Sequence, residues 1–220
     1  MFNPFRTEAS EIAPGEAYKV YGTPAATMND KDFQRKVGKG RAAAGSKGEQ
    51  LVFNKLREKG GWAPADTPVF CSLKVPGKAT DIDFAIVRGS KVLLIDAKMY
   101  RQDGGFFWNY GDRTHIRRGF GHYRNSKGET MTLSKSMVMA KDIISRNLPS
   151  GFTVEAMVVF TTDNSNPNAK MPTTWALKYP GNIAVCNDAS APRFINRFLG
   201  GQKRTTDTHN AERYLRSLVQ

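Results

Sequence analysis

The chain has 220 residues, of which 40% are hydrophobic and 24% charged, so it is long enough to bury a sizeable core and has the composition of a folded protein. Its 33 Lys and Arg against 20 Asp and Glu give a net charge of +13, which favours a polyanionic partner through attraction to phosphate and counterion release. No apolar run reaches the roughly 18–20 residues that span a bilayer, and the N-terminus lacks the layout of a signal peptide, so we expect neither a membrane segment nor export.

The first part of the chain is predicted to be irregular and basic. Prolines and glycines interrupt residues 1–27, and no hydrophobic period is sustained there. The clearest helix follows over about residues 43–59, where Val52 and Leu56 lie on one apolar face and Gly60 stops the helix.

Three strands are predicted in quick succession after this helix. They cover residues 69–75, 81–87 and 91–98, and the second alternates between apolar and polar side chains. Only residues 88–90 separate the last two strands, so these strands are expected to pair as an antiparallel hairpin.

The remainder alternates between helix and strand. Residues 99–129 are rich in glycine, aromatic residues and arginine and have no helical period. Beyond them we predict a helix over 131–147, strands over 154–160 and 183–186, and helices over 191–199 and 208–218. This order predicts an α/β fold with a mixed sheet flanked by helices.

The predicted elements divide the chain into three parts. Residues 1–42 form a basic N-terminal extension, residues 43–200 the main domain, and residues 201–220 a C-terminal helix packed on the core. Cys71 and Cys186 lie in separate apolar strands and are predicted to be buried structural thiols, because a zinc site would need more ligands at close spacing. Reduced thiols make a cytoplasmic location the default expectation.

Candidate catalytic side chains occur at the end of the predicted hairpin. Asp96 and Lys98 are two residues apart on one strand and therefore project to the same face, and the short turn pairs Asp83 with positions 96–97. Close carboxylates raise each other's pKa unless a cation neutralises them, and Mg²⁺ prefers such oxygen ligands. Taken alone, these residues also fit a solvated strand end with an Asp96–Lys98 salt bridge. Asp81 is the alternative ligand on the first strand.

The ordered motifs resemble the PD-(D/E)xK nuclease superfamily, and within it the nuclease-related (NERD) domains. The resemblance covers roughly residues 44–160 and consists of Gly48-Glu49 on the first helix, Asp81-Ile82-Asp83 on a strand and Ile95-Asp96-Ala97-Lys98 on the next. It implies a restriction-endonuclease-like αβββαβ core. The family's Asn-Pro-x-x-Gln-like signature is not evident, since Leu133-Ser134-Lys135-Ser136-Met137 stands in its place.

The resemblance also implies roles for the site residues. Asp83 and Asp96 would bind Mg²⁺ or Mn²⁺, and Lys98 would be the catalytic lysine. Glu49 would add a further metal ligand, directly or through water. An equally weighted interpretation makes Glu49 a first-turn carboxylate favoured by the helix dipole.

Nucleic-acid contacts are predicted mainly from the segment after the catalytic strand. Cations interleaved with aromatic side chains suit contact with phosphates and bases. The alternative is a twisted hairpin with Phe106 and Trp108 packed beneath it and its arginines in water. The cations predicted to contact nucleic acid are Arg101, Arg113, Arg117, Arg118 and Lys135.

The sequence thus predicts a Mg²⁺- or Mn²⁺-dependent nuclease that cleaves DNA, expected to act as an endonuclease. No phosphate-binding loop of the Gly-x-x-x-x-Gly-Lys-(Ser/Thr) kind occurs, so no nucleotide cofactor is expected. Whether the chain forms a homodimer remains open. Two alternatives also stay open: a catalytically silent DNA-binding or virion/assembly protein that retains the nuclease fold, and an RNA-directed nuclease.

Overall fold

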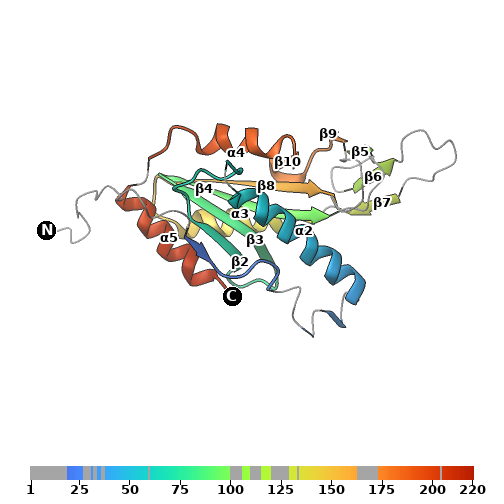
Figure 1. Ribbon diagram of the computed structural model, residues 1–220, viewed down its shortest axis with the longest axis horizontal. Coiled ribbons are helices and arrows are strands. Elements are labelled where there is room, and N and C mark those ends of the chain that lie inside the picture. Colours follow the sequence, from blue (N-terminus) through green and yellow to red (C-terminus); the bar gives the residue numbers. More distant parts are fainter. Residues whose placement is uncertain are drawn as a thin grey trace, which may run out of the picture.

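Six strands form the central sheet of the computed structural model, in the order β1-β2-β3-β4-β8-β10 (Figure 1). The strands are β1 (Val20–Tyr21), β2 (Val69–Lys74), β3 (Asp81–Arg88), β4 (Lys91–Met99), β8 (Thr153–Thr161) and β10 (Ala184–Asn187). β2, β3 and β4 pair antiparallel, whereas β1 is parallel to β2, and β4, β8 and β10 are parallel to one another. The mixed sheet and the predicted hairpin are therefore confirmed.

The structure describes residues 19–26, 31, 34–35, 38–58, 60–99, 106–109, 115–119, 129–132, 134–162, 173–203 and 205–220. For the three short segments within 106–132, only the backbone is described.

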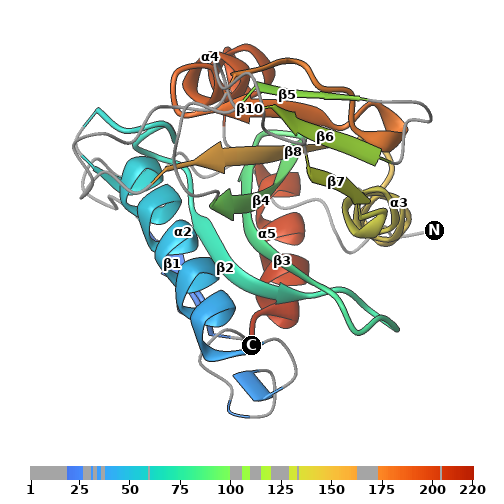
Figure 2. The same cartoon turned by 90° about the vertical axis from the view of Figure 1, so that its right-hand side faces the viewer.

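Helices cover both faces of the sheet (Figures 1 and 2). On one face, α2 (Lys39–Arg57) and α4 (Ala191–Leu199) pack against a core that includes Phe84 and Ile95. On the other face, α3 (Ser136–Asn147) and α5 (Thr206–Leu218) pack against a core that includes Leu94. This arrangement confirms the restriction-endonuclease-like α/β fold expected from the sequence.

β4 is the strand that carries two of the candidate site residues. Its Leu93, Ile95 and Ala97 belong to the core under α2 and α4, while Val92 and Leu94 belong to the opposite core. Because helices cover both faces of the sheet, this strand is a nearly continuous apolar run. Such a run indicates a strand from the sequence alone. The same alternation directs Asp96 and Lys98 to the face covered by α3 and α5.

The structure contains a second sheet of four strands. Its order is β7 (Glu129–Thr132), β6 (His115–Gly119), β5 (Phe106–Asn109) and β9 (Thr173–Ala176), and it lies at one end of the molecule (Figure 1). The prediction of a helix beginning at residue 131 is wrong, because residues 129–132 pair with β6 and α3 begins only at Ser136. Two β-branched threonines in Glu-Thr-Met-Thr favour a strand.

Other differences concern the ends of elements. α2 begins four residues before the predicted start, directly after Gly38, whose φ is 88°. It ends at Arg57, two residues before the predicted end, and Gly60 beyond it has a φ of 74°. Both cysteines are buried free thiols, as predicted. In the part of the chain that the structure describes, no helix combines the length and apolarity needed to cross a membrane.

Candidate active site

Asp96 and Lys98 lie at the C-terminal end of β4 and form an ion pair. Lys98 Nζ donates to Asp96 Oδ1 at 2.7 Å, so both side chains lie on one face, as the spacing predicts. The Asp96 side chain is only 9% exposed, whereas that of Lys98 is 43% exposed. The salt bridge of the solvated-strand-end interpretation is thus present, but its carboxylate is buried rather than solvated.

Asp83 comes to the same place from β3. The β3–β4 ladder extends from Arg88–Lys91 to Phe84–Ile95, and beyond it Asp83 Oδ2 accepts a hydrogen bond from the Ala97 amide at 2.7 Å. Burial raises the pKa of Asp83 well above its ordinary value. The negative charges of Asp96 and Glu49 raise it further, against the opposing effects of Lys98 and the Ala97 amide. Two carboxylates therefore interact unfavourably at one strand end, where a cation would relieve them.

Lys98 is held in its charged form. Burial alone would lower the pKa of this ammonium group, but Asp96 and Asp83 outweigh that effect and raise the pKa above its ordinary value. Tyr179 also acts electrostatically on Lys98, and its hydroxyl donates to the Ser134 carbonyl. Sequence reasoning missed Tyr179, since it follows β4 by about eighty residues and no motif marks it.

Glu49 approaches from α2, on the other side of β4. It is 4% exposed, and its Oε2 accepts a hydrogen bond from the Ala25 amide at 2.9 Å. Burial raises the pKa of Glu49 to about 7; the Ala25 amide and Lys98 lower it, while Asp96 and Asp81 raise it. Glu49 lies in mid-helix, so the interpretation of this residue as a first-turn carboxylate is wrong.

Gly48 explains how α2 reaches the end of β4. A Cβ atom on Gly48 would lie 2.7 Å from the Met99 Cβ, closer than real side chains approach. The absence of a side chain at Gly48 therefore lets the backbone of α2 pass against the strand that carries Asp96 and Lys98. This contact brings Glu49 into electrostatic range of both residues.

The carboxylates at this strand end match the donor preference of the divalent cation that the sequence implies. Within the described residues, no group of three His, Cys, Asp or Glu side chains is placed so that it could hold a metal ion. Asp83 and Asp96 do come together, and their oxygens are the hard donors that Mg²⁺ or Mn²⁺ accepts. Mg²⁺ keeps several waters and needs only one or two carboxylates in sites that bind phosphate. The pair therefore fits such an ion, with Glu49 outside the pair.

The structure describes only some of the other predicted site residues. Arg101 and Arg113 lie outside the described residues, and Arg117 and Arg118 form part of β6, where only the backbone is described. Lys135 is exposed and lies directly before α3. Asp81 begins β3, is half-buried and pairs with Lys74 of β2 in the ladder.

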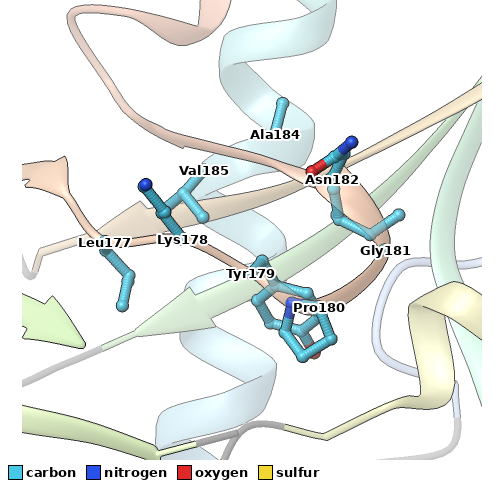
Figure 3. A pocket seen from close by; sticks show the side chains of 9 residues that line it. Leu177, Lys178, Tyr179, Pro180, Gly181, Asn182, Ala184 and Val185 are labelled. Carbon is cyan, nitrogen blue, oxygen red and sulfur yellow. The ribbon is translucent and has the colours of Figure 1, made fainter. Parts of the chain in front are cut away.

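A hollow adjoins this region between β9 and β10 (Figure 3). It has a volume of about 400 Å³ and is lined by residues 177–185, including Lys178, Tyr179 and Asn182. Figure 3 shows the Lys178 and Tyr179 side chains leaving the chain in different directions. Trp175, on β9 just before the hollow, is 81% exposed. No local sequence pattern marks Trp175, because β9 has only four residues and is too short to show a period.

One comparison with known protein families gives a match that spans this region. A family model described as nuclease-related domain (NERD) matches residues 44–161, which is more than half of the chain and includes Glu49, Asp83, Asp96 and Lys98. No curated protein and no solved structure matches the chain.

Proposed function

The chain belongs to the nuclease-related domain (NERD) family, and from this premise we propose that it is a metal-dependent nuclease that hydrolyses phosphodiester bonds of DNA. One observation carries the proposal. Asp83 and Asp96 are brought together at the end of two antiparallel strands, with the Lys98 ammonium 2.7 Å from Asp96. Two neighbouring carboxylates repel each other and lower the stability of the fold unless a bound cation neutralises their charge.

Asp83 and Asp96 would hold the divalent cation. When bound, this cation would lower the pKa of a coordinated water and neutralise charge on the phosphate. The donors present are carboxylate oxygens, which suit Mg²⁺ or Mn²⁺ better than a soft metal.

Lys98 would contribute charge rather than accept a proton. Its pKa lies above the ordinary value, so the side chain is an ammonium group at neutral pH and cannot act as a general base. From the end of β4 it can donate hydrogen bonds to a phosphate oxygen or to the attacking water, and it would offset the negative charge that develops in the transition state. Its partly exposed position leaves it accessible to a substrate strand.

The proposed substrate is DNA, bound by cations and an exposed aromatic side chain near this strand end. The net charge of +13 favours a phosphate polymer. Lys135 and Lys178 are exposed, and both adjoin the contact between Tyr179 and Ser134. Trp175 offers an indole face on which an unpaired base can stack. Endonucleolytic action is part of the proposal.

One observation favours a second candidate, a DNA-binding protein that retains the fold without turnover. Each acidic side chain already has a protein partner: Asp96 has Lys98, Asp83 the Ala97 amide, and Glu49 the Ala25 amide. Such a protein would bind DNA in a salt-sensitive manner. It would be indifferent to Mg²⁺ and to changes at Asp83.

The test is cleavage of plasmid DNA, single-stranded DNA and RNA by the purified full chain in Mg²⁺, Mn²⁺ or EDTA. We expect nicking or linearisation of DNA that requires the metal and is lost in Asp96→Asn. Asp142→Asn is the matched control, since Asp142 is an exposed carboxylate paired with Arg146 on α3. Full activity of Asp96→Asn, or cleavage in EDTA, would refute the proposal. Metal-independent DNA binding without cleavage would favour the second candidate.

A further inference from the structure

The buried acid of α2 is held by a segment that lies outside the family-matched region. The Ala25 amide donates to Glu49 Oε2 at 2.9 Å, across 24 residues of sequence. Ala25 is 3% exposed and Glu49 4%, so this hydrogen bond is shielded from water. Residues 19–26 precede the matched segment 44–161, yet they reach its candidate active site.

Ser72 anchors the turn that presents this amide. Its Oγ donates to the Thr23 carbonyl at 2.8 Å and accepts from the Ala26 amide at 3.2 Å, so one hydroxyl holds both ends of the turn. Ser72 is 3% exposed and lies within β2 with a φ of 51°, in the left-handed region. A non-glycine residue in this conformation costs on the order of 1 kcal/mol, which the two hydrogen bonds can offset.

The rest of the segment is fixed on the same strand. β1 pairs parallel with β2, through Val20–Val69 and Tyr21–Phe70. Gly22 lies so close to β2 that a Cβ on it would come within 2.5 Å of the Cys71 carbonyl oxygen. The turn therefore has a defined position over α2 and β2, and Ala25 is not free to move away from Glu49.

We propose that Ser72 and the turn of residues 23–26 are positioning elements of the candidate active site, which orient the Glu49 carboxylate so that it strengthens binding of a divalent cation at Asp83 and Asp96. The inference rests on the proposed function. A hydrogen bond from an amide favours the ionised carboxylate, the form that attracts a cation. Groups that orient metal-binding side chains typically change metal affinity by 10–100-fold when removed.

Ser72→Gly is the test variant, because glycine removes the anchoring hydroxyl and also adopts a φ of 51° without strain. Ser72→Ala removes the same hydroxyl but keeps the strain, so a common effect of the two variants belongs to the hydroxyl. Thr208→Val is the control: its buried hydroxyl also donates to a backbone carbonyl, that of Gly89 in the β3–β4 turn, at the opposite end of the hairpin from Asp83 and Asp96.

The measurement is Mn²⁺ affinity of the full-length protein by titration calorimetry without nucleic acid, with thermal melting to verify folding. We expect Ser72→Gly and Ser72→Ala to bind Mn²⁺ roughly tenfold more weakly. Thr208→Val should stay within about twofold of wild type, since it removes a buried hydroxyl that contacts neither Glu49 nor the turn of residues 23–26. The cleavage rate of Ser72→Gly should fall at limiting Mg²⁺ and recover at high Mg²⁺, with unchanged DNA affinity in EDTA.

The outcomes separate the two proposals. Wild-type protein that binds Mn²⁺ and cleaves DNA, together with a Ser72→Gly variant of unchanged or tighter Mn²⁺ affinity, would overturn the positioning role and leave the nuclease function standing. Tighter binding would mean that the turn withholds Glu49 from the cation. Wild-type protein that neither binds Mn²⁺ nor cleaves DNA would overturn both.

Discussion

Glu49→Gln should stabilise the metal-free protein at alkaline pH. The substitution removes the charge but keeps a carbonyl oxygen that can accept the hydrogen bond from Ala25. Burial raises the pKa of Glu49 from 4.5 to about 7. The folded state therefore binds a proton that the unfolded chain has already lost, and stability falls as pH rises between these values.

The size of this stability difference follows from the rise in the pKa of Glu49 from 4.5 to about 7. Since each pH unit corresponds to about 1.4 kcal/mol, ionising Glu49 in the folded protein costs about 3 kcal/mol at pH 8. At pH 5 the cost is less than about 1 kcal/mol, because this pH lies only slightly above the ordinary pKa of 4.5. Removing the charge should also relieve Asp83, whose pKa Glu49 helps to raise.

Urea unfolding in EDTA, followed by circular dichroism, measures the effect for wild type and Glu49→Gln at pH 5 and pH 8. We expect the variant to be more stable by about 2–3 kcal/mol at pH 8 and by less than about 1 kcal/mol at pH 5. Added Mn²⁺ should narrow the difference at pH 8, because the ion stabilises the charged form. A variant that is no more stable at pH 8, or a difference independent of pH, would refute the reasoning.

Three further predictions concern α2, Lys98 and the exposed tryptophan. Gly48→Ala should destabilise the protein by about 1–3 kcal/mol, because its Cβ would meet Met99 at 2.7 Å. Gly40→Ala, on the same helix with nothing within 4 Å, should be neutral or stabilising by up to about 1 kcal/mol, and chemical unfolding compares the two. Lys98→Met should lower kcat for DNA cleavage by about 10²–10³-fold, and it should destabilise the metal-free protein because it leaves the buried Asp96 carboxylate without its cation. Steady-state kinetics in which kcat is unchanged would contradict the role given to Lys98. Trp175→Ala should weaken binding of a single-stranded oligonucleotide by about 1–3 kcal/mol without lowering kcat, and equal fluorescence-anisotropy titrations of the two proteins would exclude base stacking at Trp175.

The parts of the fold that the sequence predicts well are those with local signals. β3 and β4 are apolar on both faces and joined by a tight turn, so their existence and pairing follow from the sequence. Asp96 and Lys98 share a face for the same local reason. The helix Ala191–Leu199 was predicted with the correct bounds, since its apolar positions recur at helical spacing.

The features missed from the sequence depend on contacts between distant residues. β9 is four residues long and pairs with β5 across some sixty residues of chain, so no local pattern marks it. The hydrogen bonds of Ser72 and Ala25 depend on positive φ angles and on partners far along the chain. The family resemblance identifies Glu49 as a site residue, but the sequence does not locate the start of α2 and therefore does not place Glu49 in mid-helix.

The central claim is that Asp83 and Asp96 together hold a divalent cation beside Lys98. Anomalous diffraction from crystals grown with Mn²⁺ tests it most directly, with Asp96→Asn crystals as the comparison. The account predicts an anomalous peak in contact with carboxylate oxygens of both Asp83 and Asp96 in the wild type, and loss of that peak in the variant. A wild-type structure without a peak between these carboxylates, or a peak that persists unchanged in Asp96→Asn, would contradict it.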